Sequence, residues 1–473
     1  MDSNDAMSIR PAGPYLGHLS NQGTEYSSQQ VLVQDADGRV RYTPFTRFVD
    51  TFPAELLAEI FLQLTELEDE EVALSTPQLW SCIDIQLYTA RESEDYVDLK
   101  RRWLESARNT PLCVYLHDHS DFILPTGIPD PDASLVSLMQ AIGRSSRQWE
   151  FIAIDVKDRL LMDALFSTVQ NDFPLLKSLN LDSEVDPSLP GVVDSDADFP
   201  ISFLNAPRLH QIMVFRYRSI LVPWAQITWF WSSEIPLHSV YDILSRASRL
   251  VDASFEIGPG DGYVTDVRHT ISCAHLKKLN VKAPSAWAFT VRNSPLAVLQ
   301  HLNAPSLRKL TLGSHQSAEF GFNPLACDVS PFLHFLSQPS RGLQSLELLY
   351  QPVTSEDLVR CLKAIPSLAR LVLLSSLLSD LNILFNQLTG DSDFLPRLVY
   401  VRIYRYSGTG THSIDENGLA RMLAWRWAAV GVAQLQCFHM PRYKYRSEII
   451  DEKAWSTFQR LEEEGMGLCL SDV

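Results

Sequence analysis

The stretch Pro366-Ser-Leu-Ala-Arg-Leu-Val-Leu373 decides the fold, because its pattern returns along the chain. Apolar residues occupy the first, fourth and sixth places of Leu368-x-x-Leu371-x-Leu373. The apolar residues at the fourth and sixth places are separated by one residue, as expected when one face of a short β-strand is buried. The stretch therefore predicts a short strand with one buried face.

The same pattern occurs at many other places. Close copies are Leu176-x-x-Leu179-x-Leu181, Leu276-x-x-Leu279-x-Val281, Leu307-x-x-Leu310-x-Leu312, Leu343-x-x-Leu346-x-Leu348 and Leu398-x-x-Val401-x-Ile403. Looser copies begin at Trp149, Leu209, Leu250 and Leu435. Strand copies spaced by roughly 20–50 residues indicate stacked repeats, and L-x-x-L-x-L is the pattern of leucine-rich repeats.

Helical patterns lie between the strand copies. The clearest is 357–365, which follows Thr354-Ser-Glu-Asp, a Ser/Thr-led acidic start typical of a helix N-terminus. Other predicted helices are 95–108, 135–142, 160–169, 239–247, 332–336, 378–388, 416–430 and 449–464. Strands that alternate with helices predict an α/β leucine-rich-repeat solenoid, a curved parallel sheet with the helices outside. We expect 111–116 to be its first strand.

Composition narrows the functional classes. A hydrophobic content of 45% in 473 residues is typical of a folded protein with a large core. The net charge of −17 argues against non-specific binding of nucleic acid or anionic membranes, which requires a basic surface. Residues 1–14 lack a signal-peptide profile, and the most apolar window, 221–231, is too short to span a bilayer.

The cysteines are scattered and never form a C-x-x-C pair. They therefore predict reduced thiols in a cytoplasmic or nuclear protein, with disulfides as the alternative. They are Cys82, Cys113, Cys273, Cys327, Cys361, Cys437 and Cys469.

Residues 52–64 form a well-marked helical pattern. Pro53 suits the first helical position, and Glu55 lies in the first turn, where the helix dipole favours an acid. The apolar residues form one wide face, which periodicity alone also allows in an ordinary core helix. They are Leu56, Leu57, Ile60, Phe61 and Leu64.

The string from Phe52 to Leu64 resembles the opening of the F-box, Leu-Pro-x-Glu-Leu/Ile-x-x-x-Ile-Phe-x-x-Leu, with Phe52 in place of its leucine. Residues 73–80, Ala-Leu-Ser-Thr-Pro-Gln-Leu-Trp, are similar to its ending in fungal members. Between Leu64 and Val72 stands only Thr-Glu-Leu-Glu-Asp-Glu-Glu, where the family carries a longer insert. The resemblance to fungal F-box proteins with leucine-rich repeats implies docking onto the adaptor subunit of a cullin-RING ubiquitin ligase. The adaptor-binding residues would be Phe52, Pro53, Leu56, Leu57, Ile60, Phe61 and Leu64.

We expect four segments. Residues 1–49 are a mostly disordered N-terminal segment, 50–87 a partial, all-α F-box-like segment, 88–440 the solenoid, and 441–473 a charged helical cap. Within the solenoid, Pro223-Trp-Ala-Gln-Ile-Thr-Trp-Phe-Trp231 resembles an element of the same fungal proteins and predicts an extra short strand. Its tryptophans suit either core packing or a partner anchor.

The motifs G-x-G-x-x-G, G-x-x-x-x-G-K-[ST], H-E-x-x-H and G-x-S-x-G do not occur, and no cofactor or catalytic residue is predicted. His117 and His119 share one side of an extended segment but have no further ligand nearby, so no metal site is predicted. Asp194-Ser-Asp-Ala-Asp198 lacks the glycine and glutamate of a calcium loop, and we interpret it as a solvated loop. The protein is therefore not expected to be an enzyme.

In each L-x-x-L-x-L copy, the residues beside the fourth-place apolar residue point to the concave sheet face. The predicted client-binding residues are Lys278, Asn280, Lys309, Thr311, Arg370, Tyr400 and Arg402. Their basic bias favours an acidic or phosphorylated client segment. Lysines and arginines that merely keep the sheet soluble are the alternative.

The predicted function is recruitment of a client protein to a ubiquitin ligase. The alternative is an interaction scaffold that never associates with the ligase.

Overall fold

The computed structural model describes most of the chain. It covers residues 32–34, 40–42, 77–87, 90, 93–117, 133–156, 158–182, 202–215, 220–258, 270–283, 295–314, 328–338, 342–349, 353–375, 381–405, 415–440 and 451–470. The chain divides into two compact units, Met1–Ser75 and Thr76–Val473. In the first, β1 (Leu32–Gln34) pairs antiparallel with β2 (Val40–Tyr42). The F-box-like helix predicted at 52–64, with its adaptor-binding residues, lies outside the described residues.

The second unit is built on a 14-stranded sheet in which every neighbouring pair of strands is parallel. Each strand between the two edge strands pairs with the strand of the repeat before it and with that of the repeat after it. In order, the strands are β3 (Cys82–Gln86), β4 (Leu112–His117), β5 (Trp149–Asp155), β6 (Ser178–Asp182), β7 (Gln211–Val214), β8 (Trp229–Ile235), β9 (Asp252–Ile257), β11 (Lys278–Ala283), β13 (Lys309–Ser314), β14 (Ser345–Leu349), β15 (Arg370–Ser375), β16 (Tyr400–Arg405), β17 (Cys437–His439) and β18 (Gly467–Cys469).

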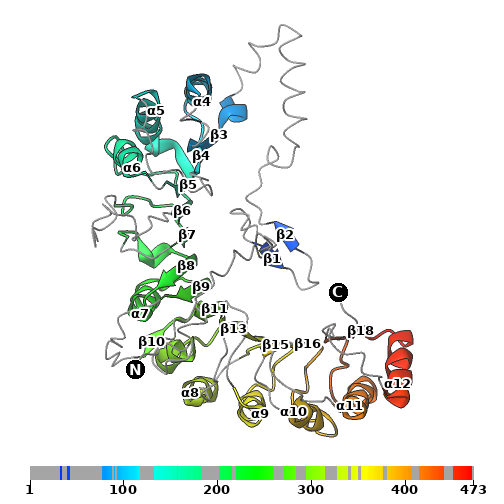
Figure 1. Ribbon diagram of the computed structural model, residues 1–473. Helices are drawn as coiled ribbons and strands as arrows, with labels where there is room; N and C mark the ends of the chain where they lie inside the picture. Colours follow the sequence, from blue (N-terminus) through cyan, green and yellow to red (C-terminus); the bar gives the residue numbers. More distant parts are fainter. Residues whose placement is uncertain are drawn as a thin grey trace, which may run out of the picture. The chain divides into compact units, whose positions relative to one another are not determined.

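Helices follow most of the strands. Figure 1 shows the described helices of this unit along the outer side of the sheet. They are α4 (Glu94–Ala107), α5 (Ala133–Arg144), α6 (Arg159–Phe166), α7 (Leu237–Arg246), α8 (Ser330–Ser337), α9 (Ser355–Lys363), α10 (Leu381–Leu388), α11 (Glu416–Ala428) and α12 (Glu452–Glu463). The predicted α/β class, parallel sheet and alternation of strand with helix are therefore confirmed.

Short elements complete the helix side. The 3-10 turns are η2 (Pro77–Trp80), η3 (Ser146–Gln148), η4 (Trp224–Gln226) and η5 (Pro295–His301). A separate two-stranded parallel sheet pairs β10 (Ile271–Ser272) with β12 (Leu302–Asn303).

The leucines of the repeat pattern align across the sheet as buried rungs. In five successive strands, the residue at the fourth place of the pattern lies directly beside its counterpart on the next strand, and its side chain is at most 1% exposed. These residues are Leu279, Leu310, Leu346, Leu371 and Val401. Burying a leucine side chain stabilises a fold by about 1.5–3 kcal/mol. One repeated rung therefore supplies much of the core of this unit.

A tight turn sets the start of many strands. The N–H of Leu368 donates to the carbonyl oxygen of Ile365 at 3.1 Å, and Leu307 bonds to Ala304 in the same way, also at 3.1 Å. Proline holds the second position of these turns, at Pro366 and Pro305. Because proline presets φ near −65°, it suits that position and directs the chain into the next strand.

The helix predicted after Thr354 begins as expected. The Thr354 hydroxyl accepts a hydrogen bond from the N–H of Asp357 at 3.1 Å, and α9 then buries Leu358, Cys361 and Leu362. An N-cap of this kind stabilises a helix by about 1 kcal/mol.

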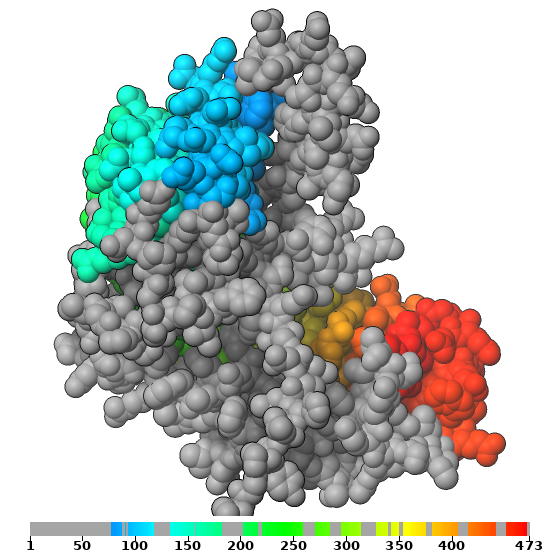
Figure 2. Space-filling model, turned by 45° about the horizontal axis from the view of Figure 1, so that its top comes forward, coloured from blue at the N-terminus to red at the C-terminus, as the bar shows by residue number. Residues whose placement is uncertain are grey.

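The sheet is longer at both ends than the sequence predicted. It starts at β3, one strand before the predicted 111–116, within the range assigned to the F-box-like segment. At the other end α12 is followed by β18, which adds a final strand. Figure 2 shows these first repeats in blue to cyan and the last ones in orange to red.

An aromatic residue protects the first edge of the sheet. The Tyr96 hydroxyl accepts a hydrogen bond from the N–H of Gln86 at 3.1 Å and donates to the carbonyl oxygen of Asp84 at 3.4 Å. Pairing of this kind blocks edge-to-edge association of β3 with another strand.

Candidate protein-binding face of the sheet

The side chains that alternate with the buried rungs lie on the face of the sheet away from the helices, which we call the inner face. All the client-binding residues predicted from the sequence lie on it. The register places Lys278 beside Lys309, and Arg370 beside Tyr400. Residues far apart in the sequence therefore form one continuous surface.

The predicted lysines are already paired with acids. Lys278 Nζ lies 3.2 Å from Asp252 Oδ2, and Lys309 Nζ lies 3.0 Å from Glu347 Oε1. Thr311 Oγ1 donates to Glu347 Oε2 at 3.1 Å. These contacts offset the charge of both lysines, so they are weaker candidates for capturing an anion than their sequence positions predict.

Asn280 has a similar local role. Its Nδ2 donates to Ser254 Oγ on the neighbouring strand at 2.9 Å, while its Oδ1 is buried without a hydrogen-bond partner in the described part of the chain. Asn280 therefore links β9 to β11 and keeps an acceptor on the inner face.

Two arginines stack on two tyrosines farther along the sheet. The Arg370 guanidinium carbon lies 4.1 Å from the centre of the Tyr400 ring, and that of Arg402 lies 4.4 Å from the centre of the Tyr404 ring. We call these four residues the arginine–tyrosine cluster. Stacking uses the face of a guanidinium and leaves its in-plane N–H groups available as donors.

Several nitrogens of this region are shielded from solvent and lack a hydrogen-bond partner among the described residues. They are Arg370 Nε, Arg402 Nε and His439 Nε2. Arg370 Nε lies 3.8 Å from Glu347 Oε1, within ion-pair range but too far for a hydrogen bond. An unmade buried hydrogen bond costs about 1–3 kcal/mol, so a donor set of this kind favours an anionic ligand.

The surroundings tune the neighbouring titratable groups. Burial lowers the pKa of His439 below its usual value, and the charge of Arg402 lowers it further. Burial raises the pKa of Tyr404, and Arg402 opposes that shift. The positive charge near neutral pH therefore comes from the arginines, and an anion bound beside them would raise the pKa of His439.

A second part of the inner face is apolar. Met213, Phe215, Trp229 and Trp231 are half-buried there, on or directly after β7 and β8, and we call them the aromatic patch. The rings of Phe215 and Trp231 lie 4.5 Å apart. Partly exposed tryptophans beside each other are typical of protein-binding surfaces.

The core-packing expectation for the tryptophan-rich stretch is confirmed for Trp224, and the partner-anchor expectation stays a prediction for the other two tryptophans. Trp224 is 4% exposed and its ring centre lies 5.6 Å from that of Phe230, so it packs in the core. Trp229 and Trp231 lie on the inner face. The extra strand predicted in this stretch is confirmed as β8.

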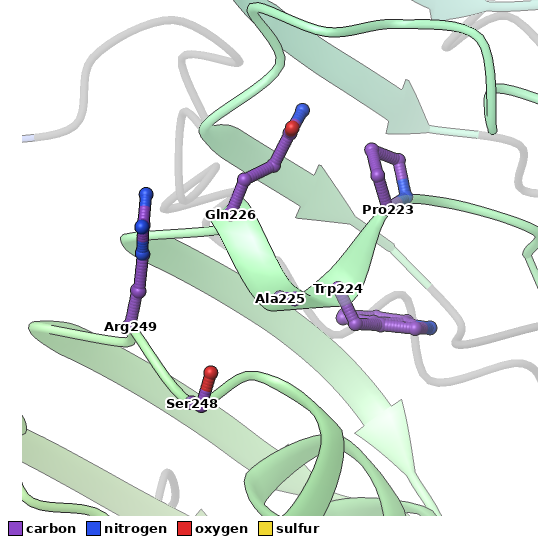
Figure 3. Close-up of a pocket in the computed structure, with 6 residues that line it drawn as sticks. All are labelled: Pro223, Trp224, Ala225, Gln226, Ser248 and Arg249. Atoms are coloured by element: carbon purple, nitrogen blue, oxygen red, sulfur yellow. The ribbon is translucent and has the colours of Figure 1, made fainter.

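A depression of about 500 Å³ lies beside Trp224, lined by Pro223, Trp224, Ala225, Gln226, Ser248 and Arg249 (Figure 3). Gln226 Nε2 donates to the carbonyl oxygens of Ala206 and Leu209, at 2.6 and 2.8 Å, and so holds the loop in place. We assign this depression no function, because its main polar side chain already serves the fold.

The histidine pair considered from the sequence is only partly described. His117 is 7% exposed, and its Nε2 lies 3.9 Å from Asp84 Oδ1. His119 lies outside the described residues, as do 194–198. Within the described ranges, no group of three His, Cys, Asp or Glu side chains is arranged to hold a metal ion. None of the helices described here has the length and hydrophobicity needed to cross a bilayer.

Sequence reasoning missed Tyr404 and His439, and from the aromatic patch it missed Met213 and Phe215, although it considered the tryptophans as partner anchors. Tyr404 follows Arg402 by two residues, so strand alternation puts it on the same face. His439 is the direct neighbour of Arg402 on the next strand, which the register alone reveals.

No protein-family model matches the chain, and a search of curated proteins also gives no match.

Proposed function

We propose that this protein recruits a client protein to a cullin-RING ubiquitin ligase and binds that client through the inner face. The observation that carries the proposal is the continuous inner face, which is lined by polar, charged and aromatic side chains and, among the described residues of this unit, is not covered by a helix. A long curved sheet of this kind is a typical binding surface of solenoid proteins. The proposal assigns the chain no catalytic step of its own.

Support for the link to the ligase comes from the sequence. Residues 52–64 and 73–80 resemble the two ends of an F-box, and the apolar face of the first stretch would contact the adaptor subunit. The scattered cysteines and the absence of C-x-x-C pairs support activity in the cytoplasm or nucleus. The acidic composition supports a protein client rather than nucleic acid or a membrane.

Co-purification with the adaptor subunit tests the proposal. The full-length chain should retain the adaptor, and Ile60→Asp or Phe61→Asp should abolish retention, because each puts a charge on the apolar face. Arg402→Gln, on the inner face, is the matched control and should retain the adaptor fully. If the unmodified chain retains no adaptor, the link to the ligase is wrong.

The second candidate function is a protein-interaction scaffold without a ligase. It is favoured by the short sequence between Leu64 and Val72, which leaves out the middle of the F-box pattern. Client capture through the inner face in the absence of adaptor binding would support this candidate.

A further inference from the structure

The inner face changes its charge along the sheet. In the described parts of β3 to β9 its charged side chains include the acids Asp84, Asp155, Asp252 and Glu256 and no lysine or arginine. From β11 to β16 the charged side chains of the described inner face are instead mainly cations, and Glu347 is the acid among them. The cations are Lys278, Lys282, Lys309, Arg370 and Arg402. The later strands are therefore complementary to a negatively charged partner.

Ion pairs offset the two lysines Lys278 and Lys309 more closely than the arginines of the arginine–tyrosine cluster. Asp252 offsets Lys278, and Glu347 serves Lys309 at 3.0 Å. Glu347 is farther from Arg370, at 3.8 Å, and Arg402 makes no ion pair with any described residue. Arg402 and Lys282 are therefore the two cations named above that make no ion pair with a described residue, and Arg402 belongs to the cluster.

The spacing of the two arginines suits a group with several oxygens. Arg370 and Arg402 lie one strand apart and two residues apart along the strand direction, which separates their Cα atoms by about 8 Å. A carboxylate is satisfied by the fork of one arginine. A phosphate ester carries a charge of about −1.5 to −2 and three acceptor oxygens, so it can bridge two guanidinium groups.

Resting on the proposed function, we propose that the arginine–tyrosine cluster binds the phosphate of a phosphorylated serine or threonine in an extended client segment, while the aromatic patch holds an apolar side chain of the same segment. Arg370 and Arg402 donate to the phosphate oxygens through the N–H groups that stacking leaves free. His439, the neighbour of Arg402, contributes a further nitrogen at the same place.

The sheet sets the distance between the two anchors. Between β8 and β15 or β16 lie five or six strand steps of about 4.8 Å, which together cover roughly 24–29 Å. An extended peptide covers about 3.3 Å per residue, so the phosphorylated residue and the apolar anchor are separated by about seven to nine residues.

Fluorescence anisotropy with the full-length chain tests this proposal. The probes are labelled synthetic peptides in which a phosphoserine lies eight positions before or after a leucine, together with their serine and glutamate counterparts. We expect the phosphopeptide in one of the two orders to bind at least about tenfold more tightly than its serine counterpart, as charge-assisted hydrogen bonds to two arginines predict.

Two variants locate the binding site. Arg370→Gln combined with Arg402→Gln should remove the preference for phosphate, whereas Trp231→Ala should weaken the serine and phosphoserine peptides by the same factor. The matched control, Arg159→Gln combined with Lys363→Gln, removes two exposed charges on the helix side and should bind like the unmodified chain. Circular dichroism confirms that each variant is folded.

The outcomes separate this inference from the proposed function. Equal binding of the glutamate and phosphoserine peptides, or an unchanged phosphate preference in the double arginine variant, overturns the phosphate site. If Trp231→Ala still weakens the peptides in that case, the inner face remains a client-binding surface. If no peptide binds in either order, both the phosphate site and the use of the inner face are contradicted.

Discussion

The two faces of the sheet use the same strands for different purposes. On β13 and β14, Leu310 and Leu346 point toward the helices and are fully buried, while Lys309 and Glu347 point the other way and form an ion pair. The helix side repeats nearly the same apolar residue in every strand. The inner face carries acids on β3, β5 and β9, the aromatic patch at β7 and β8, and arginines on β15 and β16, so stability comes from repetition and recognition from variation.

The largest expected loss of stability comes from a substitution on the helix side of the sheet. Leu310→Asp puts an unpaired carboxylate into a fully buried rung, and we expect it to lower the free energy of unfolding by more than about 4 kcal/mol. Urea denaturation followed by circular dichroism measures this loss.

Ser345→Asp is the matched control on the inner face. Ser345 is half-buried and lies between Lys309 and Arg370 on the neighbouring strands, so a carboxylate gains cationic neighbours there. A change within about 1 kcal/mol is expected. Equal losses for the two variants would contradict the division between the faces.

A charged residue also stabilises the helix side. Arg426 on α11 is fully buried, and its guanidinium donates to the carbonyl oxygens of Leu388 at 3.1 Å, Leu395 at 3.0 Å and Phe394. Burial lowers its pKa to about 10, so it remains charged at neutral pH. Arg426→Met removes these three hydrogen bonds, although the Leu395 oxygen still accepts the N–H of Leu398, and should cost about 3 kcal/mol.

Arg421 on the same helix provides the comparison. It is exposed, and Arg421→Met should change the free energy of unfolding by less than about 0.5 kcal/mol. Denaturation midpoints of the two variants measure the difference, and similar midpoints would show that the Arg426 contacts do not stabilise the fold.

The smallest effect concerns the cysteines of the two faces. Burial raises the pKa of Cys273 to about 11 and that of Cys361 to about 12 on the helix side. Because the thiolate is the reactive form, alkylation of both at pH 8 should be at least about 100-fold slower in the folded chain than in urea. Cys437 is half-buried on the inner face and should react faster than either.

The same shifts predict a dependence of stability on pH. A thiol whose pKa is raised by folding contributes stability below its unfolded pKa of about 8.5, and this contribution is lost as pH rises toward 11 and 12. Site-resolved mass spectrometry after iodoacetamide treatment measures the reactivity. Folded-state labelling of Cys361 as fast as that of Cys437 would contradict the burial argument.

Most strands could be predicted because their pattern depends on only a few neighbouring residues. Leu368, Leu371 and Leu373 show by themselves that one face of a short strand is buried. β3 and β18 were missed, because Cys82–Gln86 and Gly467–Cys469 lack the anchoring leucine of the pattern. Their place in the sheet depends on pairing with a neighbouring strand.

The binding surface was harder to predict than the fold. The sequence indicates that Lys278, Lys309, Arg370 and Arg402 share a face, but not which of them are paired. Glu347 offsets Lys309 more closely than it does Arg370. The register places both cations one strand from Glu347 and level with Ser345, so the placement of their side chains decides that difference.

The sequence by itself determined the residues of each face, because alternation along a strand is a local property. It also determined the class of fold and the parallel direction of the strands, because helical patterns alternate with the strand patterns. The tertiary structure alone decided which charges are offset, which tryptophans are buried and why Arg426 lies in the core. These outcomes depend on distances between residues about 20 to 40 positions apart, and packing and strand register set those distances.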